Sequence, residues 1–322
     1  MKKILVTYNM FRAGFAELES KYAVTFPLVE NTNFKYDEVL AMIPEYDALC
    51  SMFNFPVTQE LMDKAVKLKV ISNYAVGYDN IDIEYALERG IAVTNTPDPV
   101  TNPTADLALA LLLDTARCVT EWDRKMRLYG YKIKRSLAEN FGLPVTHKTL
   151  GILGMGRIGK ALCKRATACS MNVIYHNRRQ LSIEEETRLG VTYVSKEELL
   201  TRSDFISVNA PYTPETFHII GEAELNKMKP TAILINTARG ALIDEKALIQ
   251  SLQNNQIAGA GLDVFEFNDF PLPELLLLDN VVLTPHIGTQ IHDSRIEMTK
   301  NVCDNVIGFF ESDRPVFRVL SP

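Results

Sequence analysis

The sequence predicts an α/β protein built from two doubly wound parallel sheets. Short β-branched runs alternate with helical patterns along the whole chain, and the alternation begins a second time near residue 149. The 322-residue length favours two domains, since a domain takes about 150 residues. Apolar residues make up 47% of the chain and charged residues 23%, which is the balance of a folded globular protein.

The first series of elements lies within roughly the first hundred residues. We expect strands at 3–8, 48–51, 70–73 and 91–94, with helices at 58–65 and 81–89. Gly90 is suited to end the second helix. Pro97 and Pro99 push their predecessors toward extended conformations, so we expect the 94–99 segment to be non-helical and to mark a domain boundary.

A long helical pattern follows this boundary, from Asn102 to about Tyr129. Pro103 suits the first turn of a helix, because N–H groups there have no partner within the helix and the N–H that proline lacks is not missed. Much of the 107–113 stretch is apolar all round, which predicts burial on more than one side. A dimer interface or an interdomain surface would bury it in this way.

The second series begins at Thr149 and predicts another parallel sheet. We expect its strands at 149–152, 173–175, 205–208, 232–236, 258–263 and 281–283. A final helix at about 291–310 comes too late to extend this sheet and could return to the first domain.

Composition limits the partners and the compartment. The net charge of −6 has no long run of one sign, which excludes the electrostatic footprint of nucleic-acid binding and a polybasic membrane patch. Five cysteines at spacings that fit no zinc pattern are interpreted as reduced thiols, and we predict no metal site. Without a targeting segment or a membrane span, the sequence predicts a cytoplasmic protein that acts on small molecules.

A glycine motif points to a nucleotide. Gly154, Gly156 and Gly159 follow an apolar strand and open a helical pattern, which is the context that makes such a motif informative. The three glycines permit a tight turn, a close approach of a pyrophosphate and close helix–strand packing, and the helix start offers unpaired N–H groups to phosphate. The alternative is a glycine-rich turn without a ligand.

The residues that follow the next strand bear on the choice of dinucleotide. An acidic side chain about 20 residues after the motif would bind the ribose 2′-hydroxyl of NAD(H). This chain has Asn177, Arg178 and Arg179 there, a neutral amide and two guanidinium groups that can accept a 2′-phosphate. NADP(H) is therefore favoured over NAD(H), unless the arginines are only solvated surface charges.

Two further segments, 235–240 and 283–288, place polar residues after expected strands, where open α/β sheets bind ligands. Reduction of a 2-oxo acid needs a cation beside the carboxylate and carbonyl, and a proton donor for the oxygen. Arg239 and His286 can supply these two functions. The remaining histidines lack such a context and are interpreted as surface or loop residues: His147, His176, His218 and His292.

Together these motifs, with the 73–82, 104–106 and 261–266 segments, resemble the D-isomer-specific 2-hydroxyacid dehydrogenases over nearly the whole chain. Within that family the sequence looks most like the glyoxylate and hydroxypyruvate reductases. The resemblance implies two Rossmann-like domains: a discontinuous substrate domain at 1–99 and 290–322, and a dinucleotide-binding domain at 100–289. It also implies a nicotinamide cofactor and a homodimer.

The resemblance further implies roles for individual residues. The backbone amides of Val76 and Gly77 would hold the substrate carboxylate, Arg239 would bind carboxylate and carbonyl, and His286 would be the acid/base. Beside the glycine motif and the 177–179 residues, the cofactor would be lined by Thr104, Arg157, Ile158, Ala210, Pro211, Thr237, Asp263, His286 and Gly288.

One departure from the family pattern stands at Asn268, where the family has a glutamate that pairs with the catalytic histidine. The neutral amide leaves open whether His286 has a carboxylate partner. It is also the one feature that favours an alternative function, a dinucleotide-sensing regulator that binds a protein partner and has lost most of its catalysis. Turnover of NADPH with a panel of 2-oxo acids would separate the two functions.

Overall fold

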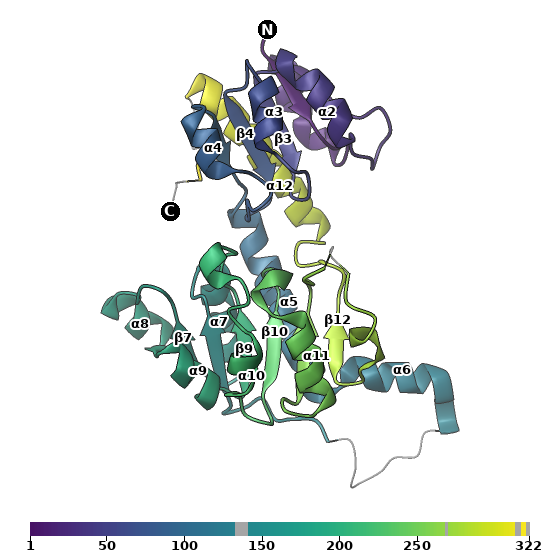
Figure 1. Ribbon diagram of the computed structural model, residues 1–322, viewed down its shortest axis with the longest axis vertical. Coiled ribbons are helices and arrows are strands. Elements are labelled where there is room, and N and C mark those ends of the chain that lie inside the picture. The colour runs from purple at the N-terminus through teal and green to yellow at the C-terminus, as the bar shows by residue number, and fades with distance from the viewer. Residues whose placement is uncertain (133–140, 268–269, 313–316, 320–322) are drawn as a thin grey trace. The chain divides into compact units, whose positions relative to one another are not determined.

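The computed structural model describes residues 1–132, 141–267, 270–312 and 317–319. The chain divides into two compact units, which we call the first unit (Met1–Val100 with Thr289–Pro322) and the second unit (Thr101–Gly288). Each has its own parallel sheet covered by helices (Figure 1). The predicted fold class is therefore confirmed. None of the helices in the described ranges combines the length and apolar character that a membrane span requires.

The first unit is a five-stranded parallel sheet with the strand order β2-β1-β3-β4-β5. Its elements are β1 (Lys3–Val6), α1 (Ala16–Lys21), β2 (Ala23–Thr25), α2 (Tyr36–Met42), β3 (Ala48–Met52), α3 (Gln59–Lys64), β4 (Val70–Tyr74), α4 (Ile83–Glu88), β5 (Ala92–Thr94) and α12 (His292–Glu311). Every residue of β3 and β4 is buried, as expected for central strands covered on both faces.

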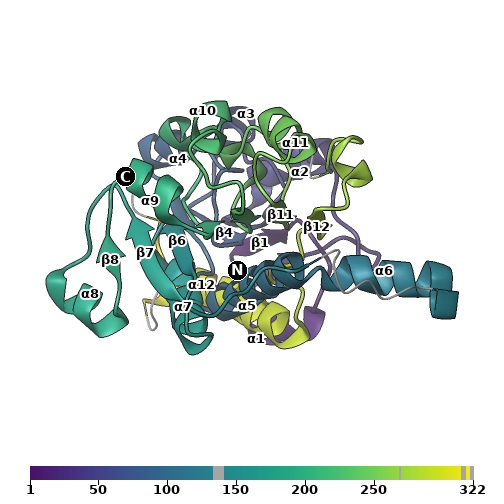
Figure 2. The ribbon, with the colours of Figure 1, turned by 90° about the horizontal axis from the view of Figure 1, so that it is seen from below.

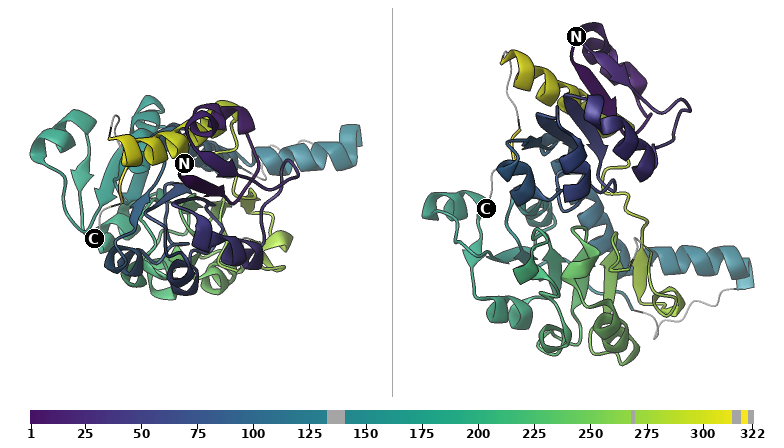
Figure 3. Two further views of the ribbon diagram at one scale, coloured as in Figure 1. Left: turned by 90° about the horizontal axis from the view of Figure 1, so that it is seen from above. Right: turned by 45° about the horizontal axis from the view of Figure 1, so that its top comes forward.

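Helix α12 joins this sheet although nearly 200 residues separate it from β5 in the chain. The Ser72 hydroxyl donates to the Val302 carbonyl (3.2 Å), and the Tyr74 hydroxyl donates to the Arg295 carbonyl (2.7 Å). Both views of Figure 3 show the yellow helix beside the purple and blue strands. The last helix thus completes the core of the first unit.

The second unit is a seven-stranded parallel sheet with the strand order β12-β11-β10-β9-β6-β7-β8. Its elements are α5 (Asp98–Arg117, which begins in the first unit), α6 (Val119–Tyr129), β6 (Thr149–Leu153), α7 (Arg157–Ala168), β7 (Asn172–His176), α8 (Ile183–Leu189), β8 (Thr192–Tyr193), α9 (Lys196–Arg202), β9 (Phe205–Val208), α10 (Glu222–Leu225), β10 (Ile233–Asn236), α11 (Glu245–Gln253), β11 (Gly259–Leu262) and β12 (Val281–Leu283). The order reverses between β6 and β9, which is where doubly wound sheets bind ligands.

Helices cover both faces of this sheet. Figure 2 shows α9, α10 and α11 on one face and α5 and α7 on the other. Two separate clusters of buried side chains fill the two layers, one including Leu199 and Leu248 and the other Leu112 and Leu162. The sheet is thus buried on both sides, and its carboxyl edge carries the connecting loops.

Three local expectations were wrong. Pro103 was expected in the first turn of the long helix, but it lies inside α5, because the helix begins earlier in the chain. The 94–99 segment was expected to be non-helical, but α5 already begins at Asp98. Pro99 falls in the first turn of this helix, where N–H groups have no partner within the helix, so its missing N–H costs no hydrogen bond. The single helix expected from Asn102 to Tyr129 is divided at Cys118, whose φ of 53° is left-handed and separates α5 from α6. The short edge strands β2 and β8 were not foreseen.

Candidate active site

The three glycines of the motif each meet a different steric demand. Gly154 has a φ of 103°, and a Cβ on it would lie 2.6 Å from the Ala210 nitrogen. A Cβ on Gly159 would overlap the Gly154 carbonyl, so the helix α7 packs directly on the turn. Around a Cβ on Gly156 there is open space, with no described atom within 4 Å. The loop therefore leaves its backbone accessible at the start of α7, as pyrophosphate binding requires.

Asn177 holds this glycine loop in place. Its side-chain oxygen accepts a hydrogen bond from the Met155 N–H (2.6 Å), and the neighbouring His176 carbonyl accepts one from the Gly154 N–H (3.0 Å). The side-chain carbonyl of Asn177 is thus engaged, so a hydrogen bond donated by this side chain must come from its NH₂ group. Arg178 and Arg179 follow as exposed residues.

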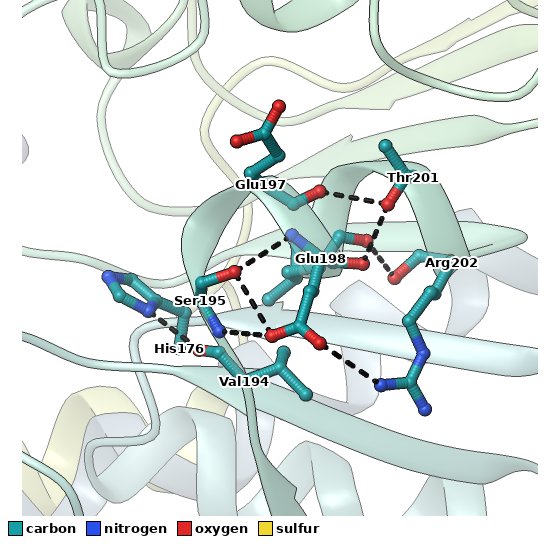
Figure 4. Close-up of polar contacts among 9 residues, drawn as sticks. His176, Val194, Ser195, Glu197, Glu198, Thr201 and Arg202 are labelled. Atoms are coloured by element: carbon teal, nitrogen blue, oxygen red, sulfur yellow. Dashed lines mark hydrogen bonds and ion pairs between the residues drawn. The ribbon is translucent and has the colours of Figure 1, made fainter.

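The end of β7, which carries Asn177, is itself anchored to the start of α9. Figure 4 shows the His176 ring directed at the Val194 carbonyl, with Nδ1 2.9 Å from the oxygen. Ser195 then caps α9 by accepting from the Glu198 N–H, and Glu198 accepts in return from the Ser195 N–H and hydroxyl. These bonds from Ser195 lower the pKa of Glu198. His176 was expected to be a surface or loop residue, but it is the partly buried last residue of β7 and has a structural contact.

The carboxyl ends of β9 and β10 present buried polar atoms without partners. Among the described residues, neither the Asn209 side-chain oxygen nor the Thr237 hydroxyl has a hydrogen-bond partner, although both atoms are buried. Such atoms are costly unless a water or ligand satisfies them. Together with the open backbone at Gly156, they fit a bound dinucleotide. Across the described ranges, no cluster of His, Cys, Asp or Glu side chains could hold a metal ion.

Arg239 begins a turn that follows β10 and is held by the last residue of that strand. The Asn236 amide donates to the Arg239 carbonyl (2.8 Å), and the Asn236 side-chain oxygen accepts from the Ala238 N–H (3.0 Å). Gly240 comes next, and a Cβ there would overlap the Phe265 carbonyl group. Only glycine therefore lets the two backbones meet at this point.

His286 lies on a loop that Asp263 holds from the end of β11. The buried Asp263 carboxylate accepts from the Thr284 hydroxyl (2.6 Å), the Ile287 N–H (2.8 Å) and the Gly288 N–H (2.9 Å). The His286 N–H also donates to the Asp263 carbonyl (2.9 Å), and His286 has a left-handed φ of 55°. Burial raises the pKa of Asp263, although these hydrogen bonds and the nearby His286 oppose the shift. We call this arrangement the Asp263 clasp.

Thr104 and Gly288, both expected to line the cofactor, lie next to this clasp. The buried Thr104 hydroxyl is 3.5 Å from the Gly288 carbonyl oxygen, and a Cβ on Gly288 would meet Thr104 and Asp263 at 3.4 and 3.3 Å. The clasp thus gathers residues from the start of α5 and from the segments after β11 and β12.

Val76 and Gly77 belong to the loop after β4 in the first unit. The Asn95 amide donates to the Val76 carbonyl (2.8 Å), and the Asn73 amide donates to the Gly77 carbonyl (2.9 Å). Within a trans peptide the C=O and N–H point in opposite directions. The Asn95 bond therefore turns the Gly77 N–H away from Asn95.

The structure thus brings most of the expected site residues of the second unit to the carboxyl edge of one sheet. Asn268 lies outside the described residues. Sequence reasoning had not singled out Asn95, Asn209 or Thr284, although each directly follows a strand, which is the position that could have indicated them. It also treated His218 as an ordinary loop residue, whereas its ring contacts Glu266.

Comparison with known proteins identifies the family. The profile of the D-isomer-specific 2-hydroxyacid dehydrogenase NAD-binding domain matches residues 109–288. A glyoxylate reductase from Thermococcus litoralis is 50% identical over 281 residues, covering 86% of this chain and 84% of that enzyme. Another from Pyrococcus horikoshii is 44% identical over 317 residues, covering 97% and 94%. The chain belongs to the D-isomer-specific 2-hydroxyacid dehydrogenases.

Solved structures of similar proteins agree over 99% of the chain. A glyoxylate reductase from Paecilomyes thermophila is 35% identical with a TM-score of 0.90, covering 99% of this chain and 98% of that one. An NADPH-dependent glyoxylate/hydroxypyruvate reductase from Sinorhizobium meliloti, in complex with NADP and malonate, is 31% identical with a TM-score of 0.86, covering 99% and 96%.

This 2-hydroxyacid dehydrogenase is therefore an oxidoreductase that transfers a hydride between a nicotinamide dinucleotide and a small 2-oxo or 2-hydroxy acid. The predicted family and the predicted enzyme class are confirmed. The alternative of a regulator that has lost most of its catalysis is not favoured, because the relatives are named as reductases.

Proposed function

We propose that this 2-hydroxyacid dehydrogenase reduces glyoxylate or a 2-oxo acid of similar size and prefers NADPH to NADH. The reductases that it resembles support the substrate class. The observation that carries the proposal is the Asp263 clasp, which holds His286 at the same edge of the sheet as the glycine loop and the Arg239 turn.

In this proposal the first unit is the substrate domain and the second unit is the dinucleotide-binding domain. The glycine loop and the match to the family profile both lie in the second unit. The cofactor would meet the N–H groups at the start of α7, near Arg157 and Ile158, and the polar atoms after β9 and β10. Its further lining would be Thr104, Ala210, Pro211, Thr237, Asp263 and Gly288.

The preference for NADPH rests on Asn177, Arg178 and Arg179. With its oxygen engaged by Met155, Asn177 offers an N–H donor, which suits a phosphate better than a ribose hydroxyl pair. Hydrogen bonds from Thr213 and the Glu215 N–H lower the pKa of Glu215, and the positive charge of Arg178 adds to this effect. The Arg178 charge therefore lies near the segment that follows Pro211.

The chemistry divides between Arg239, His286 and the loop after β4. A bound nicotinamide dinucleotide supplies the hydride that reaches the carbonyl carbon. The Val76 and Gly77 amides bind the substrate carboxylate, and the planar guanidinium of Arg239 binds both carboxylate and carbonyl oxygens. His286 donates its proton to the carbonyl oxygen, which becomes the hydroxyl of the product.

The proposal is tested by turnover. The purified protein is mixed with NADPH or NADH and a panel of 2-oxo acids of increasing size, and loss of the reduced cofactor is followed. We expect the highest kcat/KM with glyoxylate or hydroxypyruvate and a lower KM for NADPH than for NADH. Failure to oxidise either cofactor with any 2-oxo acid would contradict the proposed activity, and a clear preference for NADH would contradict the cofactor assignment.

We also propose a homodimer that α6 helps to form. None of the eleven residues of α6, all of them described, is buried, and Figure 2 shows the helix extending from the rest of its unit. Val119, Met126, Leu128 and Tyr129 expose 56–63% of their surface, which an isolated helix would leave in water. Light scattering should give twice the chain mass, and Met126→Glu should shift the protein toward the monomer. A monomeric wild type would contradict the proposal.

A cytoplasmic location completes the proposal. The five cysteines are all free, and burial raises the pKa of the Cys50 and Cys303 thiols, so neither readily forms a thiolate. Free thiols, three of them buried, suit a reducing compartment. Cell fractionation should place the 2-oxo acid reductase activity in the cytosolic fraction.

A further inference from the structure

A cluster of titratable side chains lies beside the candidate site: His218, Asp244, Glu245 and Glu266. The His218 Nε2 atom is 2.6 Å from a Glu266 carboxylate oxygen, and its Nδ1 atom is 3.9 Å from a carboxylate oxygen of Asp244. The Glu266 side chain is only 11% exposed, so water does little to replace a lost partner. The shorter contact has the length of a strong hydrogen bond to a carboxylate.

Glu266 is tied to the start of α11 by two reciprocal bonds. One Glu266 carboxylate oxygen accepts from the Glu245 N–H (3.1 Å), and the buried Glu245 carboxylate accepts from the Glu266 N–H (2.9 Å). The other carboxylate oxygen of Glu245 accepts from the Leu272 N–H (2.7 Å). The second Glu266 oxygen is the one that His218 contacts, so His218 supplies the donor that the backbone does not.

This network encloses the turn that carries Arg239. The backbone at Gly240 lies directly against Phe265 and Glu266, with no room for a Cβ. On the other side, the His218 N–H donates to the Ala241 carbonyl (2.9 Å). The main chain of His218 therefore binds Ala241, at the end of the Arg239 turn. The ring of His218 binds Glu266, in the segment against which that turn packs.

We propose that His218 is a positioning residue for substrate binding, because its bond to Glu266 keeps the Arg239 turn seated against the segment after β11. The inference rests on the role proposed for Arg239. Loss of the ring contact frees Glu266 and lets the turn move, so the guanidinium no longer meets carboxylate and carbonyl together. The glycine loop between β6 and α7 is held instead by Asn177 and His176, so we expect its affinity for the dinucleotide to stay unchanged.

The matched test uses the same substitution at two histidines. His218 and His147 both have left-handed backbones, with φ of 49° and 61°, and asparagine tolerates that conformation. His218→Asn removes the reach to Glu266, whereas His147→Asn changes an exposed loop residue. His218→Gln restores an N–H donor of similar reach. All three variants and the wild type are assayed for kcat and KM with glyoxylate, for NADPH affinity and for Tm.

We expect His218→Asn to lower kcat/KM for glyoxylate about tenfold or more, since small displacements of a positioning group are costly. NADPH affinity should stay at the wild-type value, His218→Gln should recover part of the loss, and His147→Asn should match the wild type. Glu266→Gln, which keeps an oxygen acceptor but removes the charge, should give a smaller loss of the same kind.

Three outcomes overturn the inference. One is a His218→Asn variant whose kinetics match those of His147→Asn. Another is a His218→Asn variant in which NADPH affinity and Tm fall together with kcat/KM, and in which His218→Gln recovers none of the loss. That result would indicate a general structural role. A wild type that reduces no 2-oxo acid would overturn the proposed function and this inference with it. The first two outcomes, in an active wild type, affect the inference alone.

Discussion

Asn177 combines two functions that two substitutions can separate. Its side-chain oxygen accepts the Met155 N–H at 2.6 Å, and its NH₂ group is the proposed donor to the 2′-phosphate. Asn177→Asp has the same shape and keeps an oxygen for Met155, but replaces the donor with a second, negatively charged oxygen. Asn177→Ala removes the acceptor and the donor together. The aspartate variant therefore tests the phosphate contact with the glycine loop still held.

The expected magnitudes differ for the two cofactors. A hydrogen bond to a charged group contributes about 1.5–3 kcal/mol, so Asn177→Asp should weaken NADPH binding about ten- to 150-fold. The same variant should bind NADH more tightly, because a carboxylate accepts from the ribose hydroxyls. Loss of the bond to Met155 costs about 1 kcal/mol, so the alanine variant should weaken NADH binding about fivefold.

The assay is the Kd of each cofactor, measured by calorimetry at one ionic strength because salt screens these charges. Arg239 is unchanged in both variants, so turnover with saturating cofactor serves as the control for an intact site. An aspartate variant that loses NADPH and NADH affinity by the same factor would refute the reasoning. It would show that position 177 acts only through the glycine loop.

Three further substitutions address the reacting groups. Arg239→Lys should lower kcat/KM about a hundredfold or more while NADPH affinity changes little, because lysine lacks the planar fork; near-normal kcat/KM would disprove the assigned role. Asp263→Asn places an amide NH₂ group opposite at least one of the three donors of the clasp, where two donors cannot form a hydrogen bond. The His286 loop should shift and kcat should fall about tenfold; an unchanged kcat would contradict this expectation. Asn268→Glu should move the basic limb of the kcat/KM profile to higher pH, because a nearby negative charge favours the protonated imidazole. A profile that stays in place would mean that another carboxylate partners His286 or that position 268 does not face it.

Regular structure was the most predictable part of this molecule. The central strands β3, β4 and β9 are buried along their whole length, and most of their residues are apolar, so they stand out in the sequence although each contains a serine. The edge strands β2 and β8 have three and two residues, too few to form a pattern. The break at Cys118 was unpredictable for a different reason, since a left-handed residue other than glycine leaves no mark in the composition.

The sequence by itself determined the functional groups of the site: a glycine loop, an arginine and a histidine, each after a strand of a parallel sheet. That much is local, because the strand and the residues following it are contiguous in the chain. Only the tertiary structure decided the partners. The donors to Asp263 lie 21 to 25 residues away, and Glu266 lies 48 residues from His218. Such contacts depend on which strands become neighbours and how their ends align, and this is set by the packing of the whole sheet rather than by any one segment.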